Sequence, residues 1–159
     1  MKVFVSTSVY QTLVVVEQGC QAAGLPSNCA ASRGGEFFLT NSSTWHNNTA
    51  DLKSNIYPLL VDTQLGYNGR AELGFDSVSL AGTPETTLKN QTVGGFAATD
   101  SYLGLFGIDP RSSIFNTTPP IPSYLQNLRN QSLIPSLSWG YTAGNQYRKT
   151  LPTSSNVVD

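Results

Sequence analysis

Short apolar runs alternate with polar and turn-forming residues along most of this chain, a pattern typical of many short β-strands. The clearest example covers residues 3–16, VFVSTSVYQTLVVV. Its first half alternates apolar and polar residues, and its second half ends in a continuous apolar run at residues 13–16. The pattern predicts two strands folded about a polar Ser6-Thr7-Ser8 turn, an arrangement that can hold a turn residue at the centre of a cleft.

Further strands and one helix are expected downstream. Gly66-Tyr67-Asn68-Gly69 predicts a hairpin turn, because its Asn-Gly pair readily takes the positive φ angles that a tight turn needs. Ser123 is a suitable N-cap for a short helix at residues 124–130. A turn-rich loop is expected at residues 17–35, and strands are expected at residues 36–39, 56–61, 71–80, 90–97, 103–108 and 133–141.

The composition favours the all-β class and excludes some partners. Charged residues are 12% of the 159 residues, about half the usual ~25%, and turn-forming residues take their place. With 9 basic and 10 acidic side chains and no basic cluster, the chain lacks a surface for nucleic acid or acidic membranes. The sequence has no apolar run of the ~18 residues that a membrane span needs, and its N-terminus lacks the features of a signal peptide.

Two cysteines and five glycosylation sequons indicate the secretory pathway. A loop rich in Gly, Pro and Asn separates Cys20 from Cys29 and could close easily. A disulfide there would contribute roughly 2 to 3 kcal/mol, and the alternative is two free buried thiols. We therefore expect an extracellular or cell-surface protein that has lost its leader or was recorded without it. The Asn-x-Ser/Thr sequons begin at Asn41, Asn47, Asn90, Asn116 and Asn130.

Several of these segments, in this order, resemble the N-terminal lobe of the pepsin-like aspartic peptidases. Residues 3–16 resemble the active-site hairpin of the family, with Ser6-Thr7-Ser8 in place of Asp-Thr-Gly. The resemblance extends from about residue 3 to residue 141. Several segments are similar in sequence to a divergent fungal branch of the family. The other matching segments are SSTW at residues 42–45, LGFDSV at residues 73–78, NQTVGGFA at residues 90–97 and LGLFGI at residues 103–108.

The resemblance implies a fold and a domain organisation. Residues 1–148 would form a pepsin-like acid protease N-terminal lobe, an incomplete β-barrel or sheet with one short helix, and residues 149–159 would be a disordered tail. In the family, the strand that matches residues 103–108 threads behind the active-site turn. Its glycines are required there because two backbones pass too close for a Cβ.

The resemblance also implies which chemistry is missing. The family hydrolyses peptide bonds with two aspartates, one from each lobe, that share a proton. Ser6 cannot act as a carboxylate base, Ser8 replaces the glycine of the turn, and the second lobe is not in this sequence. We expect this chain to be inactive by itself, with a peptide or protein as the ligand of its parent protein and with no metal or cofactor.

Two other interpretations remain open. The first is a non-catalytic peptide- or glycan-binding module that uses the inherited cleft, for which Tyr10, Tyr67, Phe75 and Tyr102 are the candidate lining residues. Each of these aromatic residues could equally be ordinary core or surface. The second is a truncated gene model, because a lobe without its partner leaves apolar surface and strand edges uncovered.

Overall fold

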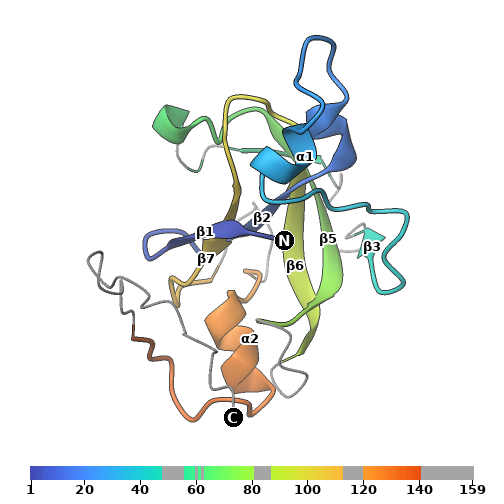
Figure 1. Cartoon of the computed structure of the whole chain (residues 1–159). Coiled ribbons are helices and arrows are strands. Elements are labelled where there is room, and N and C mark those ends of the chain that lie inside the picture. The colour runs from blue at the N-terminus through green and yellow to red at the C-terminus, as the bar shows by residue number, and fades with distance from the viewer. Residues whose placement is uncertain (48–55, 60, 62, 81–86, 113–119, 141–159) are drawn as a thin grey trace, which may run out of the picture.

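The computed structural model of the chain describes residues 1–47, 56–59, 61, 63–80, 87–112 and 120–140 (Figure 1). Within these residues, seven strands form one mixed sheet, and the helices are few and short. The all-β class expected from the sequence is therefore confirmed. The tail expected at residues 149–159 lies outside the described residues.

The sheet has the strand order β1-β7-β2-β6-β5-β3, and β4 pairs with β5. In the part of the chain that the structure describes, two short 3-10 helices and two α-helices accompany it. The strands are β1 (Val3–Ser6), β2 (Thr12–Val15), β3 (His46–Asn47), β4 (Ile56–Pro58), β5 (Arg70–Val78), β6 (Leu88–Phe96) and β7 (Gly104–Gly107). The helices are η1 (Glu17–Cys20), α1 (Cys29–Ser32), η2 (Thr63–Leu65) and α2 (Tyr124–Asn130).

The long antiparallel pair β5–β6 forms the middle of the sheet and lies at the centre of Figure 1. Both strands agree with the sequence, which predicts strands at residues 71–80 and 90–97. The pairing is irregular between Asp76 and Val78, opposite the point where Asn90 takes a positive φ of 54°. An asparagine tolerates this left-handed conformation better than most residues do.

Strand β7 lies between β1 and β2, so the expected pair of strands at residues 3–16 is not a directly bonded hairpin. β7 runs parallel to β1, with Val3 opposite Gly104 and Ser6 opposite Gly107. It runs antiparallel to β2, with Leu13 opposite Leu105. The turn after β1 is therefore closed through a third strand that comes from much later in the sequence.

The sheet buries apolar side chains on both faces. Successive residues of a strand point to opposite faces, and accordingly Leu105 and its neighbour Phe106 belong to two different core clusters. One cluster contains Leu13, Val15, Tyr67, Phe96 and Leu105. The other packs α2 against the sheet through Leu88, Phe106, Tyr124, Leu125 and Leu128.

Helix α2 begins and ends as the sequence predicts. The Ser123 hydroxyl accepts a hydrogen bond from the backbone N–H of Gln126, and the Gln126 side chain accepts one from the backbone N–H of Ser123. This reciprocal capping box fixes the first turn of the helix. The basic residue Arg129 lies in the last turn, where a positive charge suits the helix dipole.

Two of the predicted strands are shorter than expected. Within residues 36–39, only Phe37 makes a bridge, in parallel with Val16. Gly34 and Gly35 just before it have φ angles of 78° and 101°, and a turn follows at Asn41. The extended segment between them is therefore too short to form more than one bridge to a neighbouring strand. The strand expected at residues 56–61 ends at residue 58.

The hairpin turn predicted at residues 66–69 is part of a longer connection and is not a tight turn. Pro58 pairs with Arg70, so the connection between β4 and β5 spans residues 59–69 and not two residues. Positive φ angles occur at Gly66 and Gly69 (80° and 88°) but not at Asn68. The type I′ geometry that an Asn-Gly pair favours is therefore not formed here.

The strand predicted at residues 133–141 is wrong over its described part, since residues 133–137 are bends and residues 138–140 have no regular secondary structure. Ser132 has a positive φ of 58°, which turns the chain back after α2. Ile134 and Leu137 then pack against the α2 cluster. The apolar residues of this segment thus cover a helix and do not pair with a sheet edge.

Candidate functional site

The turn that follows β1 places three hydroxyl-bearing residues together. The Ser6 Oγ and the Ser8 Oγ lie 3.2 Å apart, and the Ser8 backbone N–H donates weakly to the Ser6 Oγ at 3.4 Å. Ser6 is half-buried, whereas Thr7 and Ser8 are exposed. The side chain at the expected catalytic position is therefore the Ser6 hydroxyl, which forms hydrogen bonds with Ser8 of the same turn.

Backbone hydrogen bonds from the end of β7 hold this turn from behind. Ile108 N–H donates to the Ser6 carbonyl (2.9 Å), Asp109 N–H to the Val9 carbonyl (3.1 Å) and Gly107 N–H to the Gln11 carbonyl (3.0 Å). These three bonds span the whole turn from Ser6 to Gln11. They keep its conformation fixed relative to the sheet.

Glycines make this close approach of two backbones possible. A Cβ on Gly104 would lie 2.5 Å from the Leu13 carbonyl oxygen. A Cβ on Gly107 would collide with the Val9 carbonyl oxygen and would lie 2.6 Å from the Gln11 carbonyl oxygen. A side chain at Gly104 would push β7 away from β2, and one at Gly107 would push it away from the turn.

A mainly apolar pocket of about 370 Å³ opens beside Ser6. This volume is within the range of small ligand pockets. Phe4 and Val5 of the edge strand β1 are half exposed at its rim, at 50% and 52%. The pocket is lined by Phe4, Val5, Ser6, Val9, Leu65, Tyr67 and Leu105.

Among the described residues that line the pocket, none carries a carboxylate, and the phenol of Tyr67 is the one ionisable side chain. That phenol is already used, because the Tyr67 hydroxyl donates to the Leu103 carbonyl at 2.8 Å. General base catalysis needs an unprotonated group within reach of a water or nucleophile. The pocket can therefore bind apolar groups, but its described lining residues supply no base.

Asp109 brings a carboxylate close to the turn through its backbone, yet this carboxylate is engaged elsewhere. Both of its oxygens accept hydrogen bonds from Arg111, and the closest ion-pair contact is 2.5 Å. The Arg111 hydrogen bonds hold the pKa of Asp109 below its ordinary value. A carboxylate that stays ionised and paired in this way does not share a proton with a second acid.

The four aromatic residues expected to line a cleft are not brought together around this pocket. Tyr67 lines it but is 1% exposed and packs edge-to-face on Phe96. Tyr10 lines a separate cavity of about 10 Å³. Phe75 stacks on His46, with ring centroids 5.3 Å apart, and Tyr102 is 68% exposed.

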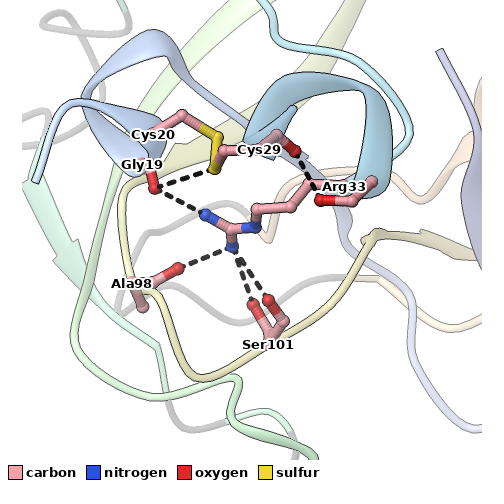
Figure 2. The surroundings of a disulfide bond; sticks show 7 residues. Gly19, Cys20, Cys29, Arg33, Ala98 and Ser101 are labelled. Atoms are coloured by element: carbon pink, nitrogen blue, oxygen red, sulfur yellow. Dashed lines mark hydrogen bonds between the residues drawn. A yellow bond between two sulfur atoms is a disulfide. The ribbon is translucent and has the colours of Figure 1, made fainter. Parts of the chain in front are cut away.

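Cys20 and Cys29 form a disulfide, as expected, with their Cα atoms 5.7 Å apart. This separation is within the range of an unstrained bridge. Figure 2 shows that the bond joins the end of η1 to the start of α1. The turn-rich loop expected at residues 17–35 thus contains two short helices that the cysteines clamp together.

A buried arginine beside this disulfide was not predicted from the sequence. The guanidinium of Arg33 donates to the carbonyls of Gly19 (2.9 Å), Ala98 (2.6 Å) and Ser101 (3.0 Å) (Figure 2). Burial lowers its pKa from the ordinary value of an arginine. Its position at the end of the predicted loop carries no periodicity or motif that marks it as buried.

A buried carboxylate, also unforeseen, connects the SSTW segment to β5. The Asp76 carboxylate accepts hydrogen bonds from the hydroxyls of Ser42 and Thr44 and from the backbone N–H of Ser77. Asp76 is 6% exposed. Three donors compensate for the loss of water around a buried carboxylate, so this cluster anchors the loop before β3.

Four of the five sequons are at exposed asparagines, namely Asn41, Asn47, Asn90 and Asn130, and Asn116 lies outside the described residues. In the part of the chain that the structure describes, His, Cys, Asp and Glu do not form a group of three that could hold a metal ion. None of the described helices is both long and apolar enough to cross a membrane.

Neither a protein-family model nor a curated protein matches this chain.

Proposed function

We propose that this chain is the N-terminal lobe of a pepsin-like aspartic endopeptidase homologue and that it is catalytically inactive by itself. Ser6 stands where the family has its catalytic aspartate, and a second aspartate would have to come from a second lobe. Peptide hydrolysis by this mechanism needs both carboxyls. A serine hydroxyl in their place leaves the attacking water without a base.

The observation that carries the proposal is the position of β7. The resemblance implies a Gly-rich strand behind the active-site turn, and β7 passes behind residues 6–11. A Cβ has no room at Gly107, which lies against this turn, or at Gly104, which lies against Leu13 of β2. The disulfide that follows β2 supports the same alignment.

The inactivity can be tested by restoring the missing groups. The chain, and the product of the complete transcript that encodes it, are assayed at acidic pH with a fluorogenic peptide and a statine-type transition-state analogue. We expect no turnover that the analogue inhibits. In the complete product, the double variant Ser6→Asp/Ser8→Gly should gain such turnover, whereas Ser138→Asp, which adds a charge at an exposed serine, should not.

Clear analogue-sensitive turnover by the unmodified protein would contradict the inactivity. A complete product that contains a second Asp-Thr/Ser-Gly turn, yet stays inactive with Ser6→Asp/Ser8→Gly, would contradict the assignment of residue 6 to the catalytic position.

The second candidate is a non-catalytic peptide- or glycan-binding module, and the pocket beside Ser6 favours its peptide form. Phe4, Val5 and Leu65 are exposed at this pocket although their side chains are apolar. An apolar pocket next to an edge strand suits an extended peptide, whose backbone adds to the sheet while a side chain fills the pocket. Because the described lining residues include no carboxylate and no imidazole, binding should not depend on pH between 4 and 8, roughly the range in which these groups titrate.

Peptide and glycan arrays with a matched pair of variants test this candidate. Phe4 and Phe38 are 50% and 40% exposed, but only Phe4 lines the pocket. Phe4→Lys should abolish peptide binding, and Phe38→Lys should leave it unchanged. Arrays without a hit, or equal losses in both variants, would remove this candidate.

We further propose that the protein works outside the cell or at the cell surface. The Cys20–Cys29 bond supports this, because disulfides persist mainly in oxidising compartments. The exposure of Asn41, Asn47, Asn90 and Asn130 is what glycan transfer requires. Mass spectrometry before and after glycan removal, on protein secreted from eukaryotic cells, should find mass at these sites. Protein that stays in the cytosol with unmodified asparagines would contradict the proposal.

A further inference from the structure

Arg33 is a buried cation that main-chain carbonyls solvate. It is 6% exposed, and among the described residues no carboxylate forms an ion pair with it. Its Cζ lies 5.8 Å from the ring centroid of Phe96, and its Nε has no hydrogen-bond partner. Because a buried charge is costly when it loses its partners, the guanidinium and its carbonyl acceptors hold one another in place.

The disulfide fixes the first of these acceptors relative to Arg33. Gly19 precedes Cys20 directly, and the Arg33 backbone N–H donates to the Cys29 carbonyl at 2.9 Å. The bond between the cysteines therefore sets the distance between the Gly19 carbonyl and the guanidinium (Figure 2). Gly19 is tightly packed as well, since a Cβ there would lie 2.8 Å from the guanidinium.

The other acceptors belong to the connection between β6 and β7, which forms part of the support of the pocket beside Ser6. A Cβ on Gly66 would lie 2.5 Å from the Asp100 carbonyl oxygen and 2.7 Å from the Ser101 nitrogen. The Tyr67 hydroxyl donates to the Leu103 carbonyl. Residues 98–103 thus contact the backbone and side chain of the segment that lines the pocket with Leu65 and Tyr67.

We propose that the Cys20–Cys29 bond controls the shape of the pocket beside Ser6 through Arg33, as a redox-sensitive conformational switch. A dithiol reductant supplies two electrons and two protons, becomes a disulfide itself, and leaves Cys20 and Cys29 as thiols. The Gly19 carbonyl is then no longer held next to Arg33 by a covalent link. The Cys29 Sγ lies 4.0 Å from the same carbonyl oxygen, so its new thiol proton competes with Arg33 for this acceptor.

The expected result of reduction is a local loosening. Residues 98–103 lose the fixed guanidinium, and residues 64–67 lose the surface on which they rest. Helix α2 packs in the other core cluster and keeps its contacts. The switch does not depend on whether the pocket binds a peptide, so it stands or fails independently of the proposed function.

Hydrogen–deuterium exchange of the full chain, with and without dithiothreitol, tests the proposal. On reduction, the amides of residues 64–67 and 98–103 should exchange about tenfold faster, and those of α2 should change by less than about twofold. Arg33→Met should produce the same pattern with the disulfide intact. The matched control Arg129→Met, at an exposed arginine of α2, should not.

Two outcomes would overturn the proposal. One is unchanged exchange of both segments after complete reduction, as verified by thiol alkylation. The other is equal acceleration of α2, which would show that the whole fold loosens without a route through Arg33. If Arg33→Met does not fold, reduction of the wild-type protein decides between these outcomes by itself.

Discussion

Replacing Gly107 with alanine should destabilise the protein, because an added Cβ meets the backbone of the turn after Ser6. The Cβ would collide with the Val9 carbonyl oxygen and would lie 2.6 Å from the Gln11 carbonyl oxygen. Both obstacles are main-chain atoms, which cannot rotate away as a side chain can. Either β7 or the turn must therefore move.

The size of the effect follows from what this movement breaks. Overpacking a well-filled site costs typically ~1–3 kcal/mol. Moving β7 also weakens the hydrogen bonds from Gly107, Ile108 and Asp109 to the turn, each with a net contribution of about 1 kcal/mol. We expect Gly107→Ala to lower the free energy of unfolding by about 3 kcal/mol, a large part of the ~5–15 kcal/mol that stabilises a typical domain.

Urea denaturation followed by tryptophan fluorescence measures this change, with Gly140→Ala as the control. A Cβ on Gly140 meets no atom within 4 Å, so that substitution should change the free energy by less than about 0.5 kcal/mol. A Gly107→Ala variant as stable as wild type, or one that is stabilised as unstrained Gly→Ala replacements often are, would refute the close passage of β7 behind the turn.

Three further predictions concern the disulfide, the helix cap and the ion pair. Replacing Cys20 and Cys29 with serine should lower the free energy of unfolding by about 2–3 kcal/mol, measured by urea denaturation. Ser123→Ala should cost about 1 kcal/mol through loss of the capping box, measured by thermal unfolding. Because Arg111 lowers the folded-state pKa of Asp109, the carboxylate contributes stability above its unfolded pKa of about 3.9, and this stability is lost as the pH falls further. Asp109→Asn should therefore flatten the acid limb of the stability curve below about pH 4.

Each of these predictions has its own control and its own contradictory result. Reductant should change the stability of the wild type but not of the double serine variant, and equal sensitivity of both would contradict the disulfide prediction. Ser136→Ala, at an exposed serine outside any helix, should be neutral, and an equal loss there would contradict the role of the cap. An acid limb that is unchanged in Asp109→Asn would show that other carboxyls determine it.

The sequence predicted those elements whose signals are local. Helix α2 has its N-cap Ser123 and its apolar face within one short stretch, and β5 and β6 are long enough for their strand character to outweigh the surrounding turns. The disulfide was also predictable, because the chain has two cysteines joined by a short flexible loop. The passage of β7 behind the turn was expected from the family resemblance and not from residue patterns.

Features that depend on distant neighbours could not be predicted in this way. Residues 133–140 have an apolar pattern that fits a strand, but the nearest partner of Ile134 and Leu137 is a helix cluster. Arg33 and Asp76 are charged, and charged residues are mostly exposed. Their burial depends on carbonyls and hydroxyls from distant parts of the chain: Arg33 donates to Ala98 and Ser101, and Asp76 accepts from Ser42 and Thr44. A local sequence pattern around Arg33 or Asp76 does not include these partners.

The pairing of β1 with β7 also determines the order in which the protein can fold. Among the described residues, β1 pairs with β7 alone, and its partner follows about a hundred residues later, a separation that slows folding. At ~5–20 residues per second, a ribosome needs about 5–20 s to deliver that partner. The neighbouring strands β5 and β6 can pair earlier, so they should nucleate the sheet, and β1 should join last. Throughout that interval Phe4 and Val5 stay exposed on an unpaired strand, which makes the nascent chain a substrate for chaperones that hold extended apolar segments.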